Sequence, residues 1–555
     1  MKSNNKIYEN RKQILFLLIF SLGLCAILFL PYTVRYHDIY FHLARLESLV
    51  TAIHNGDFFP RIFPYFYDNF GYAVSLFYSD FFLYIPAVLC LLGVDILLSY
   101  KIYNFIVIAA ISLSAYYCAE KLTEDKQAAL VTSIFYTASS YLAVDVFVRG
   151  ALGETQAFVF LPFCILGMYN AVYGNSKDRA PLIIGFSGLV LSHNLSLMLI
   201  SVLFAVFLLL NITKLVKEPK RILEIAKSSI SVVLLTAFFL FPMAEQLLKE
   251  EFFSTFHARI WNPGKAAIRI RNLFIGANLT EDPVFTPSLG ITMLIAFIIC
   301  AVMLLRKPKN NLDKFMSCMT LGSFACVFAS TSLFPWYPLD PYLNIIQFPS
   351  RFFTFVTLFL SFGVGIWWSE KISHKTDKFK NILLVLISVI CFAQFQITTY
   401  EGWKIAKDEG RTMTDMSTVI LWDENYLNGN NNRELWRDRE NYIDTARGVS
   451  RPIDITLNRD YYERHIEYSG NSVDNSIEVA AVYFLGYRAT DDLTGENLDV
   501  YPSDNGWLEI DIGNSESGQI TVDYYGTFIQ HISPYISLIF IIGFIAFKIY
   551  CKNKK

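Results

Sequence analysis

The sequence has few cysteines, and none of the nine lies in the long hydrophilic stretch between residues 398 and 530. All of them lie in or beside apolar runs, so the chain encodes no disulfide framework. The first apolar run, residues 14–31, has no charged residue and no small-residue cleavage site. It is therefore predicted to be a retained transmembrane helix and not a cleaved signal.

The composition indicates a polytopic membrane protein. Hydrophobic residues make up 54% of the 555 positions, with 48 Phe and 32 Tyr, which is more than a soluble domain with one anchor contains. The net charge of −2 points to no class of partner, and nothing in the sequence indicates a nucleic-acid partner. Lys and Arg are concentrated in a few short loops, and this distribution predicts the topology.

Twelve apolar runs predict about twelve transmembrane helices. They cover residues 14–31, 102–118, 128–146, 156–173, 181–192, 195–212, 229–248, 286–305, 315–333, 352–369, 381–397 and 533–549. All basic loops fall inside, with both termini cytoplasmic, if residues 79–92 lie at the interface and 181–212 form a hairpin. The alternative topology makes 73–93 a span and 181–212 one long helix, which places Arg149 and Glu154 on the inner side.

The chain divides into three parts by composition. Residues 1–397 are predicted to form a transmembrane module with a long first outer loop, 32–98, rich in aromatic and turn-forming residues. Acidic residues outnumber basic ones by about two to one in 398–530, where alternating segments predict a small extracytoplasmic β-sandwich. Residues 531–555 are predicted to be a final transmembrane helix and a short basic cytoplasmic tail.

Polar residues gather at the predicted outer ends of several spans. After the first span, Asp38, His42 and Arg45 are spaced to share one face of a helix at the outer surface, with apolar side chains on the other face. Three further loops carry Arg149 and Glu154, then His193, and finally Gln347 and Arg351.

Ionisable groups at membrane depth are costly and usually face a cavity or a partner. The structural alternative is that Arg149 pairs with Glu154 and that Arg351 anchors a helix at lipid headgroups. Four loops delivering such groups to one side of the membrane favour a functional site.

These motifs resemble known membrane families. A first span, an aromatic first outer loop that opens with an acidic residue, and a second outer loop with Arg and a carboxylate look like the GT-C superfamily of membrane glycosyltransferases. Segments 37–45, 149–154, 192–194 and 347–352 resemble a bacterial family labelled 6-pyruvoyl-tetrahydropterin synthase-related, and the chain is similar to the YfhO type. The resemblance covers essentially the whole chain. The pterin label carries no chemistry, because the eight histidines are scattered and form no three-histidine zinc motif.

The resemblance implies transfer of a sugar from a polyprenyl-phosphate-linked donor to an envelope polymer, a lipid or a protein at the outer face of a bacterial plasma membrane. Membrane lipids are the other expected partners. Asp38 is expected to act as general base for the acceptor hydroxyl, and arginines to stabilise the phosphate that leaves. The expected catalytic residues are Asp38 and Glu154, and the expected substrate-binding residues are His42, Arg45, Arg149, His193, Gln347 and Arg351.

The metal requirement and two competing functions stay open at this point. Glu154 is expected either to position Arg149 or to hold a divalent cation with Asp38. Two carboxylates alone are few ligands for such a cation. Related enzymes also carry an acidic pair where this chain has His37-Asp38. The competing hypotheses are an inactive GT-C-like scaffold in envelope assembly and a transporter or flippase. The presence of Asp38 argues against the scaffold, and the lack of paired mid-membrane helix breaks argues against the transporter.

Overall fold

The computed structural model describes residues 10–34, 37–253, 262–274, 287–408, 410, 412–414, 425–428, 436–470 and 475–553. The chain forms two compact units. The first comprises Met1–Leu43, Val94–Val232 and Ile260–Val419, and the second comprises Ala44–Gly93, Val233–Arg259 and Ile420–Lys555.

The first unit is a helical bundle. Its longer helices are α2 (Arg11–Leu24), α6 (Ile96–Thr123), α7 (Lys126–Thr137), α9 (Leu152–Val172), α10 (Ala180–Val190), α11 (Asn194–Leu210), most of α13 (Pro219–Leu235), α16 (Gly290–Leu304), α17 (Asn311–Ser330), α19 (Phe352–Lys371) and α20 (Asp377–Asp408). Shorter elements are η1 (Ala26–Phe29), α8 (Ser140–Val144), η3 (Asp145–Arg149), α12 (Ile212–Lys217), η5 (Pro263–Ala266), η6 (Ile270–Asn272), α18 (Trp336–Leu343), η7 (Asn344–Ile346) and η8 (Pro349–Arg351). Strands β1 (Thr33–Val34) and β2 (Thr412–Met413) pair antiparallel.

The described helices make the chain a multi-pass membrane protein. Six of them are long and apolar enough to cross a membrane, and two bent helix pairs raise this number to eight within the described residues. Four shorter apolar helices accompany them: Phe81–Leu91, α10, α11 and α16. Each of the predicted apolar runs contains a helix, so the predicted helical membrane fold is confirmed.

Three details of the predicted spans can be compared with the structure. Residues 181–212 form two helices and not one long helix, because α10 ends at Val190 and α11 begins at Asn194. The predicted span 229–248 is instead two helices, α13 and α14 (Ala237–Lys249), because Thr236 leaves the helical region of backbone space. The predicted run 381–397 continues as α20 to Asp408.

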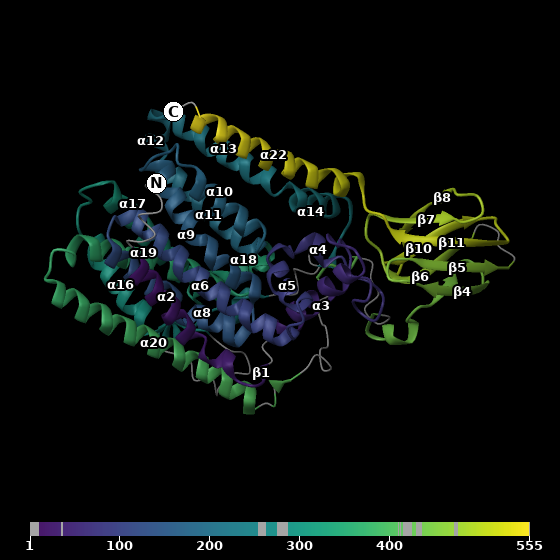
Figure 1. Ribbon diagram of the computed structural model, residues 1–555, viewed down its shortest axis with the longest axis horizontal. Coiled ribbons are helices and arrows are strands. Elements are labelled where there is room, and N and C mark those ends of the chain that lie inside the picture. The colour runs from purple at the N-terminus through teal and green to yellow at the C-terminus, as the bar shows by residue number, and fades with distance from the viewer. Residues whose placement is uncertain are drawn as a thin grey trace. The chain divides into compact units, whose positions relative to one another are not determined.

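Helices pack closely inside the first unit (Figure 1). The central helix α19 contacts α7, α16 and α17, and α9 contacts α6 and α10. Small residues permit the α9–α10 approach: a Cβ added at Gly167 would lie 2.7 Å from the Leu182 backbone, and one at Gly185 would lie 2.8 Å from the Cys164 nitrogen. Such close backbone approaches are typical of helix pairs in membranes.

The second unit combines helices with a β-sandwich. Its helical elements are most of α3 (Ile39–His54), α4 (Val74–Phe77), η2 (Phe81–Leu83), α5 (Tyr84–Leu91), α14, η9 (Arg439–Tyr442) and α22 (Phe528–Asn553). The strands are β3 (Ala446–Gly448), β4 (Asp454–Arg459), β5 (Arg464–Ser469), β6 (Asn475–Val482), β7 (Tyr487–Asp491), β8 (Asn497–Leu498), β9 (Val500–Pro502), β10 (Trp507–Gly513) and β11 (Ser517–Tyr524). Residues 554 and 555 of the predicted basic tail lie outside the described residues.

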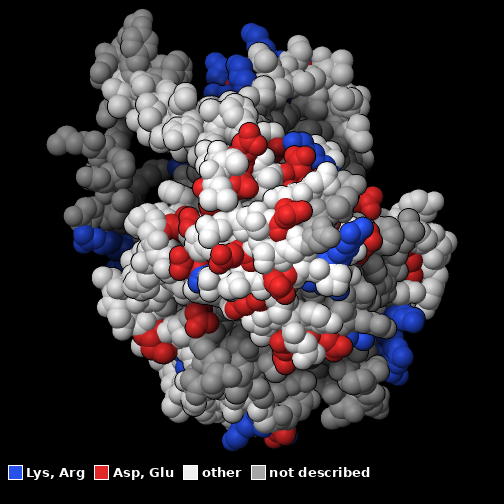
Figure 2. All heavy atoms as spheres, turned by 90° about the vertical axis from the view of Figure 1, so that its right-hand side faces the viewer, with Lys and Arg blue, Asp and Glu red and all other residues white. Residues whose placement is uncertain are grey.

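The strands form two antiparallel sheets with the orders β3-β6-β10-β9 and β4-β5-β11-β7-β8. Side chains from both sheets build one apolar core, which includes Ile477, Leu508 and Ile520, each fully buried. Alternation along β10 and β11 directs every second side chain inward, as the sequence predicts. A C-terminal β-sandwich is therefore confirmed, and Figure 2 shows many Asp and Glu side chains on its outer face.

Much of the predicted first outer loop belongs to the second unit. The carbonyl of Phe70 accepts a hydrogen bond from Val482 N–H at 3.0 Å, and its ring lies 5.2 Å from the Trp507 ring. In the same unit, α14 and α22 run side by side, and the Gln246 side chain donates to the Leu485 carbonyl at 2.6 Å. An aromatic residue of this loop, Phe70, thus packs against the strands of the β-sandwich and is not exposed to solvent.

Candidate functional site

The candidate site lies where the consecutive helices α7 and α8 end. Ser139 caps α8 with its hydroxyl, and after α8 the chain makes one π-helical turn, η3, over Asp145–Arg149. Gly150 then reverses the chain at a φ of +66°, a conformation that favours glycine. This geometry places Arg149 beside Glu154 in the first turn of α9. Single π-turns inside helices are frequent at functional sites.

Arg149 is held between two buried carboxylates. Its Nη1 donates to Asp145 Oδ1 at 2.7 Å and to Glu154 Oε2 at 2.8 Å, and the two acidic side chains are 0% and 2% exposed. Glu154 Oε1 also accepts hydrogen bonds from the Tyr141 hydroxyl at 2.9 Å and the Thr354 hydroxyl at 3.0 Å. Because both Glu154 oxygens are engaged, this carboxylate is suited to orienting Arg149 and poorly suited to accepting a proton.

Arg351 enters the same cluster from the start of α19. Its Nη1 donates to the Ile346 carbonyl at 3.0 Å and to Gln347 Oε1 at 2.8 Å. Its Nε lies 3.7 Å from Glu154 Oε2, which is too far for a hydrogen bond. Among the described residues, this buried N–H has no hydrogen-bond partner. Buried donors are nearly always paired, so this group needs an explanation.

The backbone before Arg351 is strained. Gln347 has φ +60° and ψ −57°, and the N–H of Phe348 donates to the Ile346 carbonyl at 2.6 Å. This is the rare form of the γ-turn, and such strain tends to occur at ligand sites. The turn places the centre of the Phe348 ring 5.9 Å from Arg149 Cζ and 5.4 Å from Arg351 Cζ, so both guanidinium groups lie over the same aromatic ring.

Asp38 meets this cluster through its backbone. Its N–H donates to the Arg149 carbonyl at 2.8 Å. The Asp38 side chain is exposed, and its charge interacts with the guanidinium groups of both Arg149 and Arg351. An exposed carboxylate beside two held arginines is available to accept a proton.

His193 lies next to the same charges as the N-cap of α11. Its Nδ1 accepts the Ser196 N–H at 3.4 Å and lies 2.8 Å from the Ser196 hydroxyl. Burial lowers the pKa of His193 to about 4, with help from Arg351 and Arg149 and against the attraction of Glu154. The imidazole is therefore neutral at pH 7.

Two further predicted site residues, His42 and Arg45, lie on α3 and are buried. His42 is 3% exposed, and its ring lies 5.3 Å from the Phe41 ring. Arg45, in the second unit, is 1% exposed and pairs with Asp80 at 2.5 Å. The side chains of His42 and Arg45 are as buried as that of Leu43, so the face of α3 that carries them is not exposed to solvent. The Asp80 carboxylate compensates the charge of Arg45 and so lowers the free-energy cost of burying the guanidinium group.

The structure thus brings together six of the predicted residues: Asp38, Arg149, Glu154, His193, Gln347 and Arg351. Sequence reasoning missed Asp145, Tyr141, Thr354 and Phe348. The spacing of Asp145 four residues before Arg149 was a usable signal for an ion pair on one helix face. The hydroxyls of Tyr141 and Thr354 lie in apolar runs and gave no such signal.

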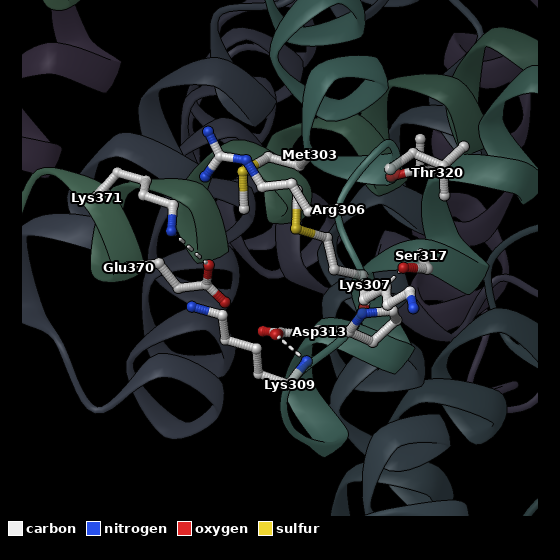
Figure 3. Close-up of a pocket in the computed structure, with 12 residues that line it drawn as sticks. Met303, Arg306, Lys307, Lys309, Asp313, Ser317, Thr320, Glu370 and Lys371 are labelled. Atoms are coloured by element: carbon white, nitrogen blue, oxygen red, sulfur yellow. Dashed lines mark hydrogen bonds and ion pairs between the residues drawn. The ribbon is translucent and has the colours of Figure 1, made fainter.

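A polar cavity lies at the other end of α19, away from Arg351 (Figure 3). It has a volume of about 80 Å³, and Arg306, Lys307 and Lys309 gather there around Asp313 and Glu370. Its carboxylates have local partners: Lys371 Nζ lies 3.7 Å from Glu370 Oε2, and the Lys309 backbone N–H donates to Asp313 Oδ2 at 2.7 Å. None of the predicted site residues lines this cavity.

Comparisons with known proteins give distant similarities. No family model matches the chain. An uncharacterised protein of Lactococcus lactis subsp. cremoris (strain MG1363) is 24% identical over 548 residues, covering 87% of this chain and 86% of that protein. The mycobacterial arabinofuranosyltransferase AftD has a TM-score of 0.45 and 12% identity over 71% of this chain, and a mutant of AftD has a TM-score of 0.42. The chain spans only 27% of the AftD chain. None of these proteins carries the YfhO-type or pterin-synthase-related label, and values this low carry no argument about activity.

Proposed function

We propose that the protein is an integral-membrane glycosyltransferase that moves a sugar from a polyprenyl-phosphate-linked donor to an envelope acceptor at the outer face of a bacterial plasma membrane. The observation that carries the proposal is the buried Nε–H of Arg351, which has no hydrogen-bond acceptor among the described residues, in a cluster that also contains the exposed carboxylate of Asp38. A guanidinium donor and a carboxylate acceptor are the two groups that sugar transfer from a phosphate requires.

The reaction assigns each group a step. The acceptor hydroxyl attacks the anomeric carbon and gives its proton to Asp38. The bond from that carbon to the phosphate oxygen breaks, and its electron pair stays on the lipid phosphate. Arg351, together with Arg149, donates hydrogen bonds to the growing negative charge, which strengthens them in the transition state.

Glu154 acts in this proposal as a positioning residue. It fixes Arg149, and its oxygens already accept bonds from Arg149, Tyr141 and Thr354. A divalent cation shared by Glu154 and Asp38 would have to displace some of these donors. In the proposed mechanism, the two arginines and not a cation therefore bind the phosphate.

The test combines turnover with lipid binding in detergent-solubilised protein. Turnover is measured with a panel of polyprenyl-phosphate sugars, and binding is measured with unglycosylated polyprenyl phosphate. Asp38→Asn keeps the shape but removes the base, so turnover should fall about 100-fold or more while lipid binding stays unchanged. Asp504→Asn, an exposed change in the β-sandwich, is the matched control.

Arginine substitutions test the phosphate assignment. Arg351→Ala should weaken polyprenyl-phosphate binding by about 10- to 100-fold, the value of one charged hydrogen bond, and Arg351→Lys should weaken it less. Near-normal turnover by Asp38→Asn would refute the assignment of Asp38 as the general base. Unchanged binding by folded Arg351→Ala, or no binding by the native protein, would refute the donor site. Binding without turnover of any sugar would favour the inactive scaffold.

A further inference from the structure

The β4–β5 hairpin of the second unit carries a second cluster of chemistry-bearing residues, far in sequence from the site above. Strands β4 and β5 pair up to Arg459 and Arg464, and the N–H of Asp460 closes the loop by donating to the Glu463 carbonyl at 3.0 Å. The two tyrosines at the tip of the loop are anchored. Tyr462 donates to Asp57 Oδ2 at 2.5 Å, and the Tyr461 ring packs 5.0 Å from that of Tyr65. The loop is therefore held in one geometry.

Three potential ligand atoms converge beside this loop. His465 Nε2 lies 3.5 Å from Asp460 Oδ2 and 3.5 Å from Glu463 Oε2. All three atoms lie within 4.8 Å of one another, and the described residues contain no other group of three such side chains this close. The side chains are 40%, 78% and 51% exposed, so an ion can reach them from solvent.

The tautomer of His465 is set by its neighbours. The Thr521 hydroxyl lies 3.0 Å from Asp492 Oδ2, and because an ionised carboxylate only accepts, the single hydroxyl hydrogen points to Asp492. Thr521 must then accept from His465, whose Nδ1 lies 3.1 Å away. In the tautomer that carries its proton on Nδ1, Nε2 directs its lone pair to the two carboxylates, where a metal ion would bind. The contact resembles metal sites, where a histidine ligand donates its other ring N–H to a neighbouring acceptor.

The distances from His465 Nε2 to the two carboxylates fit an ion site. Charged N–H···O bonds are about 2.7–2.9 Å long, so 3.5 Å is too long for a protonated His465 to bond well to either carboxylate. Ligands 2.0–2.2 Å from a tetrahedral ion lie about 3.4 Å apart, which matches both His465 distances.

We infer that Asp460, Glu463 and His465 form a binding site for a divalent transition-metal ion of the Zn²⁺ class. An imidazole ligand favours such ions over Ca²⁺ and Mg²⁺, which prefer a full set of oxygen ligands. Three protein ligands leave a fourth coordination position for water or an oxygen of a bound molecule. The acidic face in Figure 2 raises the local concentration of cations. This site is independent of the proposed sugar transfer.

The test uses the full-length protein in detergent, carrying a purification tag without histidines and stripped with a chelator. Titration with Co²⁺ should give a saturable 1:1 site with visible d–d absorption, and Zn²⁺ should displace the cobalt. His465→Gln should weaken binding at least 100-fold, and Asp460→Asn and Glu463→Gln should each weaken it about 10-fold. His374→Gln, which alters an exposed histidine between α19 and α20, should leave the affinity unchanged.

Thr521→Val tests the positioning role of the hydroxyl. This change keeps the shape of the side chain and should weaken Co²⁺ binding about 10- to 100-fold. Circular dichroism separates loss of the site from loss of the fold. Failure of the native protein to bind Co²⁺ or Zn²⁺ below 1 mM would overturn the inference, as would equal affinity in the folded His465→Gln variant.

Discussion

Arg149→Ala is the substitution whose cost follows most directly from the structure. The arginine Nη1 is the hydrogen-bond partner of Asp145 Oδ1, and the other Asp145 oxygen has none among the described residues. Removing Arg149 therefore leaves Asp145 buried and unpaired. Glu154 loses one contact but keeps the hydroxyls of Tyr141 and Thr354. Breaking one side of a buried ion pair costs about 3–5 kcal/mol, so Arg149→Ala should destabilise the fold by that amount.

The same contacts predict which second substitution restores stability. Neutralising Asp145 removes the carboxylate that has no other partner, so Arg149→Ala/Asp145→Asn should recover most of the loss. Arg149→Ala/Glu154→Gln should recover less, because Glu154 keeps two donors. The free energy of unfolding would be measured by tryptophan fluorescence in mixed micelles across the mutant cycle. A loss below about 1 kcal/mol for Arg149→Ala, or equal rescue by the two double variants, would refute the reasoning.

Three further predictions concern strain, pH and topology. Gln347→Gly and Gln347→Ala both lose the hydrogen bond to Arg351, but only glycine adopts the positive φ without strain. The glycine variant should therefore be more stable than the alanine variant by about 1 kcal/mol in the same unfolding assay. Equal stability of the two variants would argue against strain at this position. The pKa of His193 is about 4 in the folded protein and about 6.5 unfolded, so the unfolded state binds more protons between these values and stability should fall as the pH drops from 6.5 to 4. His193→Asn should flatten that pH profile while keeping a cap for α11, and an unchanged profile would exclude His193 as the cause. In a cysteine-free background, a membrane-impermeant thiol reagent applied to intact cells should label Leu493→Cys and not Lys309→Cys; the reverse pattern would contradict the predicted orientation.

The helical fold was predictable because apolar runs report directly on membrane helices. Helix breaks were not, since hydropathy carries no information about φ and ψ: Thr236 interrupts a run that is apolar on both sides. The β-sandwich was predictable from two-residue alternation in β10 and β11. The membership of residues 44–93 in the second unit was not, because contacts such as Phe70 with Trp507 join segments more than 400 residues apart.

The candidate site was predictable where charge breaks an apolar pattern. Arg149, Glu154 and Arg351 stand out in this way, and the structure places them in one cluster. Arg45 stands out equally, but its partner Asp80 lies 35 residues away with no periodic relation to it, so sequence alone could not show that its charge is already compensated. The strain at Gln347 also has no sequence signal, because glutamine rarely adopts a positive φ.

The π-turn at Asp145–Arg149 makes the cluster depend on chain length as well as on residue identity. An α-helix turns about 100° and rises 1.5 Å per residue, so a chain shortened by one residue within this turn would swing α9 and Glu154 by about that amount relative to Asp145. Such a chain would keep every charged side chain of the cluster and still lose its geometry. A relative could share these motifs and still lack one residue in this turn. A sequence alignment would match all of its charged residues to those of this chain, but its arginine would not lie between the same two carboxylates.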